Sequence, residues 1–358
     1  MFLDGIAPYA LPPAAKRDYL LTQLTALQRH HAERCPPYAR LVVDWERRGA
    51  KSESIEDLPF LPVTVFKEHD LRSGDGDAMA VRSSATTSGV ASRVYSDKET
   101  RKRQSRSANR IWVDFVGEER RPYLVFDLEE TVRGIAGLGA RGAAILSLAH
   151  LASEFHFVMR SDGNRLRLDA DALLRAVEAI GDRSFLAYGF TYLLHQAHVE
   201  LHDSGNELPP AHPESRLLHS GGWKRLQANA IDKVRFNDDV SRPWQLPASA
   251  VTDFYGLVEQ VGVPYPDCSE GLKHAPYWAE VIVRRTDTLT PAGVGETGLI
   301  QLMNCLPLSG PHHNVLTEDL GETVVEDGCA CGRRGRAFRF VGRAPRAELR
   351  GCSDVAQH

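Results

Sequence analysis

The sequence predicts an α/β fold with mixed or parallel sheets, and three observations support this prediction. The chain has 358 residues, of which 42% are hydrophobic and 25% charged, a composition typical of a globular protein with a large core. Short apolar runs alternate along the chain with stretches of helical periodicity, as in sheets covered by helices. The sequence holds neither an internal repeat nor a low-complexity segment.

The first part of the chain is predicted to be helical. Over residues 14–50, apolar side chains such as Leu20, Leu24 and Leu27 recur at helical spacing, and the prolines at positions 36 and 37 should interrupt the helix. Residues 58–63 contain two prolines and are predicted to form an extended connector rather than a central strand.

Six apolar runs further along are predicted to be buried strands. They are residues 123–128, 144–148, 184–188, 216–219, 278–284 and 298–303. A helix is predicted over residues 192–199. The aromatic and apolar segment 185–194 either lines a pocket for an acyl chain or packs as part of the core.

The charge of the chain argues against a nucleic-acid partner, since the formal net charge is -4. One segment differs, because cationic side chains crowd residues 98–110. They are Lys98, Arg101, Lys102, Arg103, Arg106 and Arg110. This run is either the solvated face of a helix or a surface that meets anions.

The sequence predicts a cytoplasmic protein. No apolar run reaches the roughly 20 residues that a membrane span needs. The N-terminus carries an acid, Asp4, where a signal peptide carries basic residues. Six cysteines in a chain of this length without a secretion signal are expected to be reduced thiols or metal ligands.

A hydroxyl-rich run at residues 83–89 is a candidate phosphate-binding loop. Its candidate ligands are Ser83, Ser84, Thr86, Thr87, Ser88 and Gly89. Hydroxyl groups and the backbone N–H groups of such a loop can surround phosphate oxygens. The run is not a Walker loop, since the sequence has no G-x-x-x-x-G-K-[ST], and taken alone it also fits an ordinary surface loop.

Three later stretches combine glycine with charged or aromatic residues. Residues 219–224 hold paired glycines and a lysine directly after a predicted strand, where open α/β sheets bind ligands. Residues 255–260 hold a carboxylate near a glycine, and residues 316–321 form a predicted acidic turn. Each stretch alone is also compatible with a tight turn, a helix N-cap or a solvated loop.

In this order, the motifs resemble those of the adenylate-forming superfamily, which includes acyl-CoA synthetases. The chain is most similar to the acyl-protein synthetase of bacterial bioluminescence, the LuxE family of long-chain-fatty-acid–luciferin-component ligases. The likeness covers nearly the whole chain and rests on L-P-V through F-K at residues 61–67, H-x-G-G-W-K, F-Y-G-x-x-E-Q, L-T-E-D-L-G and the C-terminal G-R…R-G-C. It implies the large N-terminal domain of an adenylate-forming enzyme, in a chain that ends before most of the C-terminal lid.

The resemblance implies a nucleotide site. Adenine would lie against Gly221 and Gly222, with Tyr255 and Gly256 beside both adenine and the acyl carboxylate. Asp319 would accept hydrogen bonds from the ribose hydroxyls. The loop at residues 83–89 would surround the phosphates of ATP.

Phosphate charge would be neutralised by Mg²⁺ held on Glu259, with Lys224 as the candidate cation of the protein and Arg343 near the ribose. The family's phosphate loop usually reads S-S-G-T-T-G, whereas residues 84–89 read S-A-T-T-S-G. Glycine permits positive φ and a close approach of backbone to phosphate. The altered loop therefore leaves open the alternative that this member has lost adenylation.

By the same resemblance, Cys352 is the predicted acyl acceptor, and the flanking Arg346 and Arg350 would favour its thiolate. The chain would then divide into an N-terminal helical segment (1–60), an adenylate-forming core (61–340) and a tail that carries the acceptor (341–358). The alternatives are a ligase that passes the acyl group to coenzyme A, a carrier protein or an amine, and a non-catalytic member of an acyl-handling complex.

A zinc site is also predicted, because C-x-C at residues 329–331 is followed by G-R, as in related phenylacetate–CoA ligases, some of which hold zinc. The four candidate ligands are Cys268, His274, Cys329 and Cys331. Free buried thiols are the alternative, and this is the expectation for Cys35 and Cys305.

The sequence thus predicts a ligase that depends on ATP and Mg²⁺. The resemblance implies a fatty acid as the carboxylic acid substrate. It also implies an acyl reductase or acyl carrier as a partner, in a complex that could be oligomeric.

Overall fold

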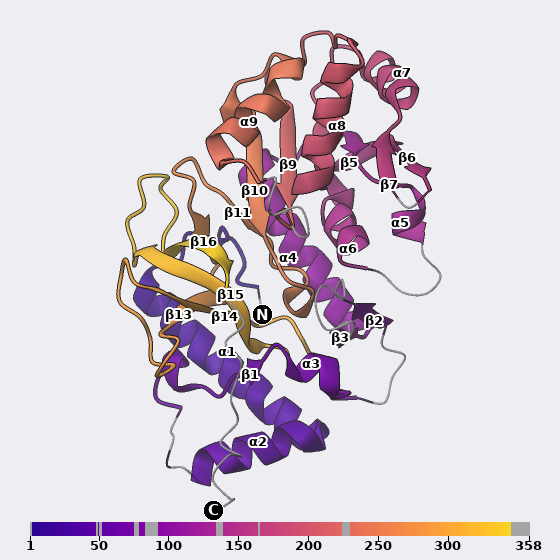
Figure 1. The fold of residues 1–358 in the computed structure, drawn as a ribbon. Coiled ribbons are helices and arrows are strands. Elements are labelled where there is room, and N and C mark those ends of the chain that lie inside the picture. The colour runs from indigo at the N-terminus through magenta and orange to yellow at the C-terminus, as the bar shows by residue number, and fades with distance from the viewer. Residues whose placement is uncertain are drawn as a thin grey trace, which may run out of the picture.

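Two six-stranded sheets form the framework of the protein, one largely parallel and one largely antiparallel. The computed structural model describes residues 2–47, 49, 52–74, 79–82, 92–133, 139–163, 165–223 and 230–344. In Figure 1 the parallel sheet and its helices occupy the upper part of the molecule, and the antiparallel sheet with helices α1 and α2 occupies the lower part. Both α/β character and mixed sheets are therefore confirmed.

The parallel sheet has the strand order β11-β10-β9-β8-β4-β5. Its strands are β4 (Arg121–Val125), β5 (Ala152–Phe157), β8 (Leu186–Phe190), β9 (Arg216–Ser220), β10 (Val251–Tyr255) and β11 (Tyr265–Pro266), the last of which is antiparallel to β10. Strands β4 and β8 are buried at every position, as expected for a parallel sheet whose two faces are covered. The predicted strands at 123–128, 184–188 and 216–219 are confirmed.

Six of the described α-helices lie in the same part of the molecule as the parallel sheet (Figure 1). They are α4 (Lys98–Val116), α5 (Glu130–Arg133), α6 (Ala140–Ser147), α7 (Ala170–Ile180), α8 (Thr191–Asp203) and α9 (Lys233–Ser241). Helices α4, α7 and α9 are each preceded by an N-cap aspartate whose side chain accepts a hydrogen bond from a backbone N–H of the first turn. The predicted helix at 192–199 lies within α8.

The antiparallel sheet has the strand order β12-β16-β15-β14-β13. Its strands are β12 (Lys273–His274), β13 (Ala279–Arg284), β14 (Thr297–Asn304), β15 (Asn314–Val325) and β16 (Ala337–Arg343). Strand β1 (Leu61–Pro62) joins it parallel to β15. Predicted strands at 278–284 and 298–303 are confirmed as β13 and β14, and the predicted connector at 58–63 contributes only the short β1.

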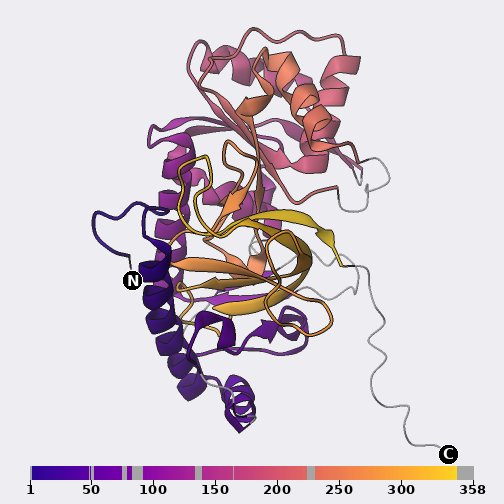
Figure 2. The ribbon, with the colours of Figure 1, turned by 90° about the vertical axis from the view of Figure 1, so that its left-hand side faces the viewer.

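The N-terminal helices α1 (Pro13–Arg34) and α2 (Pro36–Arg47) confirm the predicted helical region and the break before Pro36. Buried Leu20 and Leu24 of α1 share a hydrophobic cluster with Ile282 of β13 and with Trp278, which directly precedes that strand. Figure 2 shows α1 lying along this sheet. The remaining elements are α3 (Val65–Glu68), the hairpin β2 (Met79–Arg82) and β3 (Arg93–Ser96), the hairpin β6 (Met159–Asp162) and β7 (Arg165–Leu168), and short 3-10 helices that include Ile55–Asp57 and Val258–Gln260.

One predicted strand is wrong, because residues 144–148 belong to α6 and the turn that follows it. Ile145 is completely buried, whereas Leu146 is 40% exposed. This one-sided burial is that of a helix on a surface, and alanine and leucine are strong helix formers. The apolar run looked like a strand buried on both faces only because its single exposed position is also apolar.

The cationic run belongs to α4 and largely contacts the chain itself. The guanidinium groups of Arg106 and Arg110 lie over the ring of Phe2, at 4.9 and 5.4 Å from its centroid. Arg110 also donates a hydrogen bond to the carbonyl of Ile6, and Arg103 pairs with Glu99. Arg106 and Arg110 therefore hold the N-terminal segment against α4.

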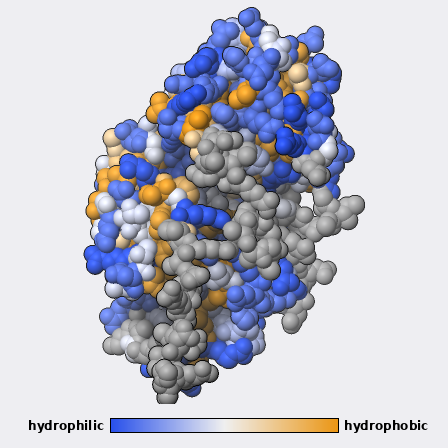
Figure 3. Space-filling model, in the orientation of Figure 1, coloured by the Kyte–Doolittle hydropathy of each residue, from blue (hydrophilic) through white to orange (hydrophobic). Residues whose placement is uncertain are grey.

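Within the residues that the structure describes, none of the helices has the length and apolar character to cross a membrane. Large apolar side chains with substantial exposure are spread over many elements, among them Val43, Phe155, Val234 and Phe340. Figure 3 shows a mostly hydrophilic face on which apolar side chains form small separate groups.

Candidate functional site

The candidate site lies where the ends of strands β9 and β10 meet the antiparallel sheet. Strand β9 ends at Ser220, and Gly221 and Gly222 follow with φ of +81° and +59°. A Cβ atom at Gly221 would approach the ring of Phe190 to 3.3 Å. Glycine is therefore favoured by backbone conformation at both positions and by close packing at the first. Both glycines are exposed, so a flat ligand can lie against them.

Three predicted site residues from the two sheets meet beside this turn. The hydroxyl of Tyr255, at the end of β10, donates a hydrogen bond of 2.8 Å to Oδ2 of Asp319 on β15. Oδ1 of the same carboxylate lies 3.4 Å from Nε of Arg343, the last residue of β16. The Tyr255 ring stacks on Phe340 with centroids 5.3 Å apart. We call Tyr255, Asp319 and Arg343 the cross-sheet triad.

Burial sets the electrostatics of the triad. It raises the pKa of Asp319, while the Tyr255 hydroxyl and the Arg343 guanidinium act in the opposite direction. The pKa of Tyr255 is raised well above its ordinary value by burial and by the neighbouring Asp319 charge. Tyr255 therefore keeps its proton at neutral pH and acts as a donor that orients the carboxylate.

The predicted acidic turn at residues 316–321 is wrong, because this segment lies inside β15. Thr317 and Asp319 are buried on one face, and Glu318 between them is exposed. The Thr317 hydroxyl donates to the carbonyl of Ile300 on β14. Acidic residues are depleted in strands, so the sequence favoured a turn.

Glu259 lies in the 3-10 helix Val258–Gln260 and is 2% exposed. Burial raises its pKa, and a hydrogen bond with Ser92 opposes that rise. Its backbone carbonyl forms a hydrogen bond of 3.0 Å with the imidazole of His312, and the side chain of Gln260 donates a hydrogen bond to the His312 carbonyl. These two hydrogen bonds to His312 hold the turn that carries the Glu259 carboxylate.

Lys67, to which the sequence assigned no role, lies near the carboxylates of Glu318 and Glu259. Nζ of Lys67 is 3.7 Å from Oε2 of Glu318, and its charge also lowers the pKa of Glu259. Helix α3 carries it directly after β1, and Phe66 anchors that helix in the core. The signal was present, since Lys67 belongs to the F-K motif of the family resemblance.

Several predicted residues lie outside the described part of the chain. They are Ser83, Ser84, Thr86, Thr87, Ser88 and Gly89 of the phosphate loop, Lys224, and Cys352. The backbone N–H of Ala344, the last described residue, donates to the carbonyl of Glu318 at 2.9 Å. The tail that carries Cys352 therefore starts beside the cross-sheet triad.

Segment 185–194 forms β8 and the start of α8, and it packs in the core of the parallel sheet. Phe185, Tyr188 and Leu194 are each at most 3% exposed, and Phe185 contacts Trp244. This packing is that of the core alternative.

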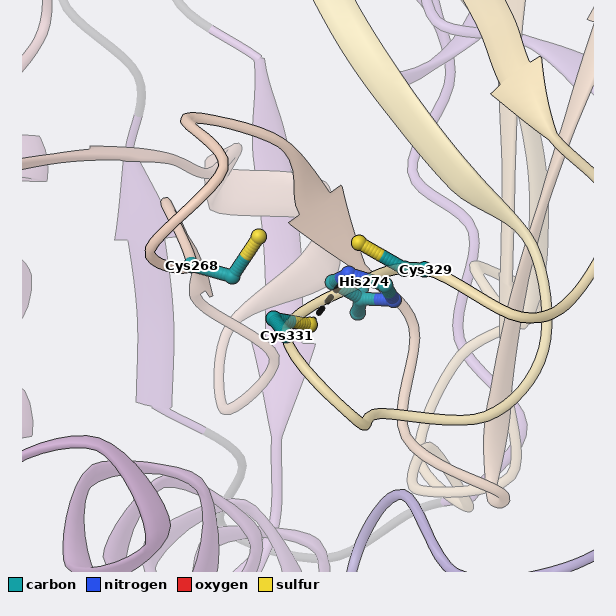
Figure 4. A group of neighbouring side chains, drawn as sticks. All are labelled: Cys268, His274, Cys329 and Cys331. Atoms are coloured by element: carbon teal, nitrogen blue, oxygen red, sulfur yellow. Dashed lines mark hydrogen bonds between the residues drawn. The ribbon is translucent and has the colours of Figure 1, made fainter.

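The four predicted zinc ligands come together. Cys268 lies on the turn before β12 and His274 ends β12, while Cys329 and Cys331 lie between β15 and β16 (Figure 4). Their ligand atoms all lie within 4.8 Å of one another, and Sγ of Cys331 is 3.4 Å from Nε2 of His274. A tetrahedral zinc with Zn–S of about 2.3 Å separates its sulfurs by about 3.8 Å, so small side-chain movements suffice. Three thiols and an imidazole fit zinc chemically.

The other two described thiols behave as expected for packing residues. Cys35 and Cys305 are 1% and 2% exposed and belong to separate hydrophobic clusters. Burial raises the pKa of Cys305 to about 12, so it stays a neutral thiol.

The fold is that of adenylate-forming ligases. An open conformation of 2-hydroxyisobutyryl-CoA ligase, solved with 2-HIB-AMP and CoA, superposes with a TM-score of 0.71 at 15% identity, covering 96% of this chain and 80% of that one. The same ligase in its thioesterification state gives a TM-score of 0.70 and covers 72% of that chain.

The sequence assigns the family within this fold. Residues 7–358 match the family described as acyl-protein synthetase, LuxE, and the chain belongs to that family. The long-chain-fatty-acid–luciferin-component ligase of Vibrio harveyi is 23% identical over 312 residues, which are 85% of this chain and 79% of the relative. The ligase of the same name from Aliivibrio fischeri is 24% identical over 274 residues, 75% of this chain and 70% of the relative.

Proposed function

We propose that this protein uses ATP and Mg²⁺ to convert a long-chain fatty acid to its acyl-adenylate and then transfers the acyl group to Cys352. The cross-sheet triad supports the nucleotide part of this proposal, because an oriented carboxylate lies beside a glycine turn at the strand ends of an adenylate-forming fold. The transfer to Cys352 rests on the family resemblance. The fatty acid follows the names of the two bacterial relatives.

The triad and the glycine turn would bind the nucleoside. Asp319 has four acceptor positions, and Tyr255 and Arg343 use only part of them, so its carboxylate can also accept hydrogen bonds from two ribose hydroxyls. Adenine would lie on Gly221 and Gly222, with Tyr255 and Gly256 at its edge. Burial of Asp319 strengthens such hydrogen bonds because little water competes for them.

Charged groups near Glu259 would act on the phosphates. A buried carboxylate whose pKa is raised is poised to gain from a cation, and Mg²⁺ prefers one or two carboxylates together with phosphate oxygens. Mg²⁺ would neutralise charge that develops on the departing pyrophosphate. Lys67, Lys224 and the loop at 83–89 would supply the remaining cationic and N–H contacts.

The proposed reaction has two steps, adenylation of the fatty acid and transfer of the acyl group to the thiol. A carboxylate oxygen of the fatty acid attacks the α-phosphorus of ATP and pyrophosphate leaves. The Cys352 thiolate then attacks the acyl carbon, a thioester forms and AMP leaves. Ala344 lies beside the site, and the eight positions from Ala344 to Cys352 span at most about 28 Å, so the tail would have the length to bring the thiol toward the adenylate.

We also propose that Cys268, His274, Cys329 and Cys331 hold one structural zinc ion. All four positions are filled by protein ligands, which is typical of a structural rather than a catalytic site. Metal analysis of the purified protein should find about one equivalent of zinc.

Labelled fatty acid, ATP and Mg²⁺ test the acyl transfer. The unaltered protein should gain a covalent label that hydroxylamine removes, and Cys352→Ser should lose the label while it keeps acid-dependent exchange of pyrophosphate into ATP. A label that survives in Cys352→Ser contradicts the acceptor assignment. Exchange without any label on the unaltered protein favours a ligase that passes the acyl group to another acceptor.

A further inference from the structure

The segment that carries two of the candidate zinc ligands crosses from one sheet to the other. It leaves the parallel sheet at β11 and enters the antiparallel sheet at β12. Residues 267–274, which we call the crossover hairpin, form a closed turn. The N–H of Cys268 donates to the carbonyl of Leu272 at 2.8 Å, and Asp267 and Lys273 form an antiparallel bridge.

The crossover hairpin has two functional faces. Cys268 and His274 point into the metal cluster (Figure 4), while their chain neighbours Asp267 and Lys273 join a buried group of charges. Successive side chains of an extended segment point in opposite directions, which explains the alternation. A metal ion held on one face would therefore constrain the charged groups on the other.

Lys273 lies at the centre of the charged face. Its Nζ is 2.9 Å from Oδ1 of Asp267 and 3.0 Å from Oδ2 of Asp253, and its side chain is only 4% exposed. A buried ammonium is stable only when it is paired and hydrogen-bonded, so the two carboxylates hold it in place. Lys233 also pairs with Asp267, but its side chain is 49% exposed.

The charged face leads to both parts of the nucleoside site. Asp253 lies two positions before Tyr255 on β10 and therefore on the same face of that strand. Across the sheet, Asp253 is in register with His219 of β9, and its Oδ1 is 3.6 Å from His219 Nδ1. That nitrogen is also 3.0 Å from the hydroxyl of Thr191, which donates to the carbonyl of Ser220, directly before the glycine turn.

We propose that Lys273 is a positioning residue for nucleotide binding and that the crossover hairpin couples metal binding at the cluster to nucleotide affinity. The inference rests on the proposed function. Lys273 touches no reacting atom. It holds Asp253, and through His219 and Thr191 it holds the ends of β9 and β10. Coupling between two sites is reciprocal, so metal and nucleotide must raise each other's affinity by the same factor.

Binding of AMP measured by calorimetry tests the positioning role without catalysis. In the metal-loaded protein, Lys273→Gln should weaken AMP binding about tenfold and raise the KM for ATP with little change in kcat, while zinc content is retained. Lys233→Gln is the matched control, since it removes a partner of the same Asp267 at an exposed position, and it should change affinity less than about twofold. Asp253→Asn, which leaves Lys273 paired with Asp267, should reproduce the loss if Lys273→Gln does not fold.

Metal removal tests the coupling. A chelated sample whose fold is verified by circular dichroism, and separately Cys331→Ser, should bind AMP several-fold more weakly than the loaded protein, and AMP should tighten zinc binding by the same factor. The inference is overturned if Lys273→Gln and Asp253→Asn both bind AMP with an affinity within twofold of that of the unaltered protein. It is also overturned if the unaltered protein binds AMP equally well with and without zinc. A failure of the unaltered, zinc-loaded protein to bind AMP at all is a different result, because it overturns the proposed function itself.

Discussion

The two sheets contribute to the candidate site in different ways. The parallel sheet offers groups that follow its strands, namely the turn at Gly221 and Gly222 and the buried Glu259 after β10. The antiparallel sheet offers charged side chains that belong to its strands, Asp319 within β15 and Arg343 at the end of β16. The hydrogen bond from Tyr255 to Asp319 joins the two contributions. The parallel sheet therefore supplies a glycine turn and one buried carboxylate, and the antiparallel sheet supplies an oriented carboxylate together with its cation.

The largest effect is expected on the parallel side, at Glu259. Replacing it with Gln removes the proposed Mg²⁺ ligand and should lower the rate of ATP–pyrophosphate exchange by about 100-fold or more. Because burial raises the pKa of this acid above its unfolded value, its ionised form costs stability as pH rises through the folded pKa. Glu259→Gln should therefore not lower the free energy of unfolding at pH 7. The exposed Glu318→Gln is the control, and equal activity losses in both variants would contradict the role of Glu259.

On the antiparallel side, Asp319→Asn should raise the KM for ATP by about 10- to 100-fold, since hydrogen bonds to a charged acceptor contribute about 1.5–3 kcal/mol. Tyr255→Phe should give a smaller increase in KM, because it removes only the group that orients Asp319. The double variant should be no worse than Asp319→Asn by itself. Additive losses would show that the two sheets act independently at the site.

A middle-sized effect is expected at Lys67, which β1 and α3 carry to the junction of the sheets. Lys67→Gln should lower exchange about tenfold, because a cation near Glu259 is lost from a partly buried position. Lys102→Gln is the control, because Lys102 is an exposed lysine on α4. Similar losses for Lys102→Gln would favour the alternative that the cationic helix, rather than the junction, meets anions.

The smallest effect concerns acid stability, where the two regions should behave alike. Burial lowers the pKa of His198, in the core of the parallel sheet, to about 4 and that of His313, beside α1 and α2, to about 3. Because the unfolded chain binds more protons below pH 6.5, the free energy of unfolding should fall as pH drops from 6.5 toward these values. The fall is about 1.4 kcal/mol per pH unit and histidine. Denaturant unfolding at pH 7 and 5.5 checks this. The free energy of unfolding should change less between the two pH values in His198→Gln and in His313→Gln than in the unaltered protein. An equal change in a variant and the unaltered protein would contradict the role of that histidine.

The same contrast explains how much the sequence could predict. The turn at Gly221 and Gly222 was found because a glycine pair after an apolar run is visible in one dimension. Asp319 was assigned to the nucleotide by resemblance but placed in a turn, because its partners Tyr255 and Arg343 are distant in sequence. The four candidate zinc ligands, named from the C-x-C spacing and the family resemblance, do come together, and C-x-C fixes two of them locally. The charged face of the crossover hairpin has no local pattern, because it arises only where the sheets meet. Lys67 belongs to the F-K motif of the family resemblance, but its approach to Glu318 depends on the fold.

Carboxylate-dependent exchange of labelled pyrophosphate into ATP tests the central claim most directly. The account predicts exchange that requires Mg²⁺, appears with long-chain fatty acids, and falls sharply in Glu259→Gln and Asp319→Asn. An absence of exchange across a panel of fatty, short-chain and aryl acids, in protein that is folded and carries zinc, would contradict it.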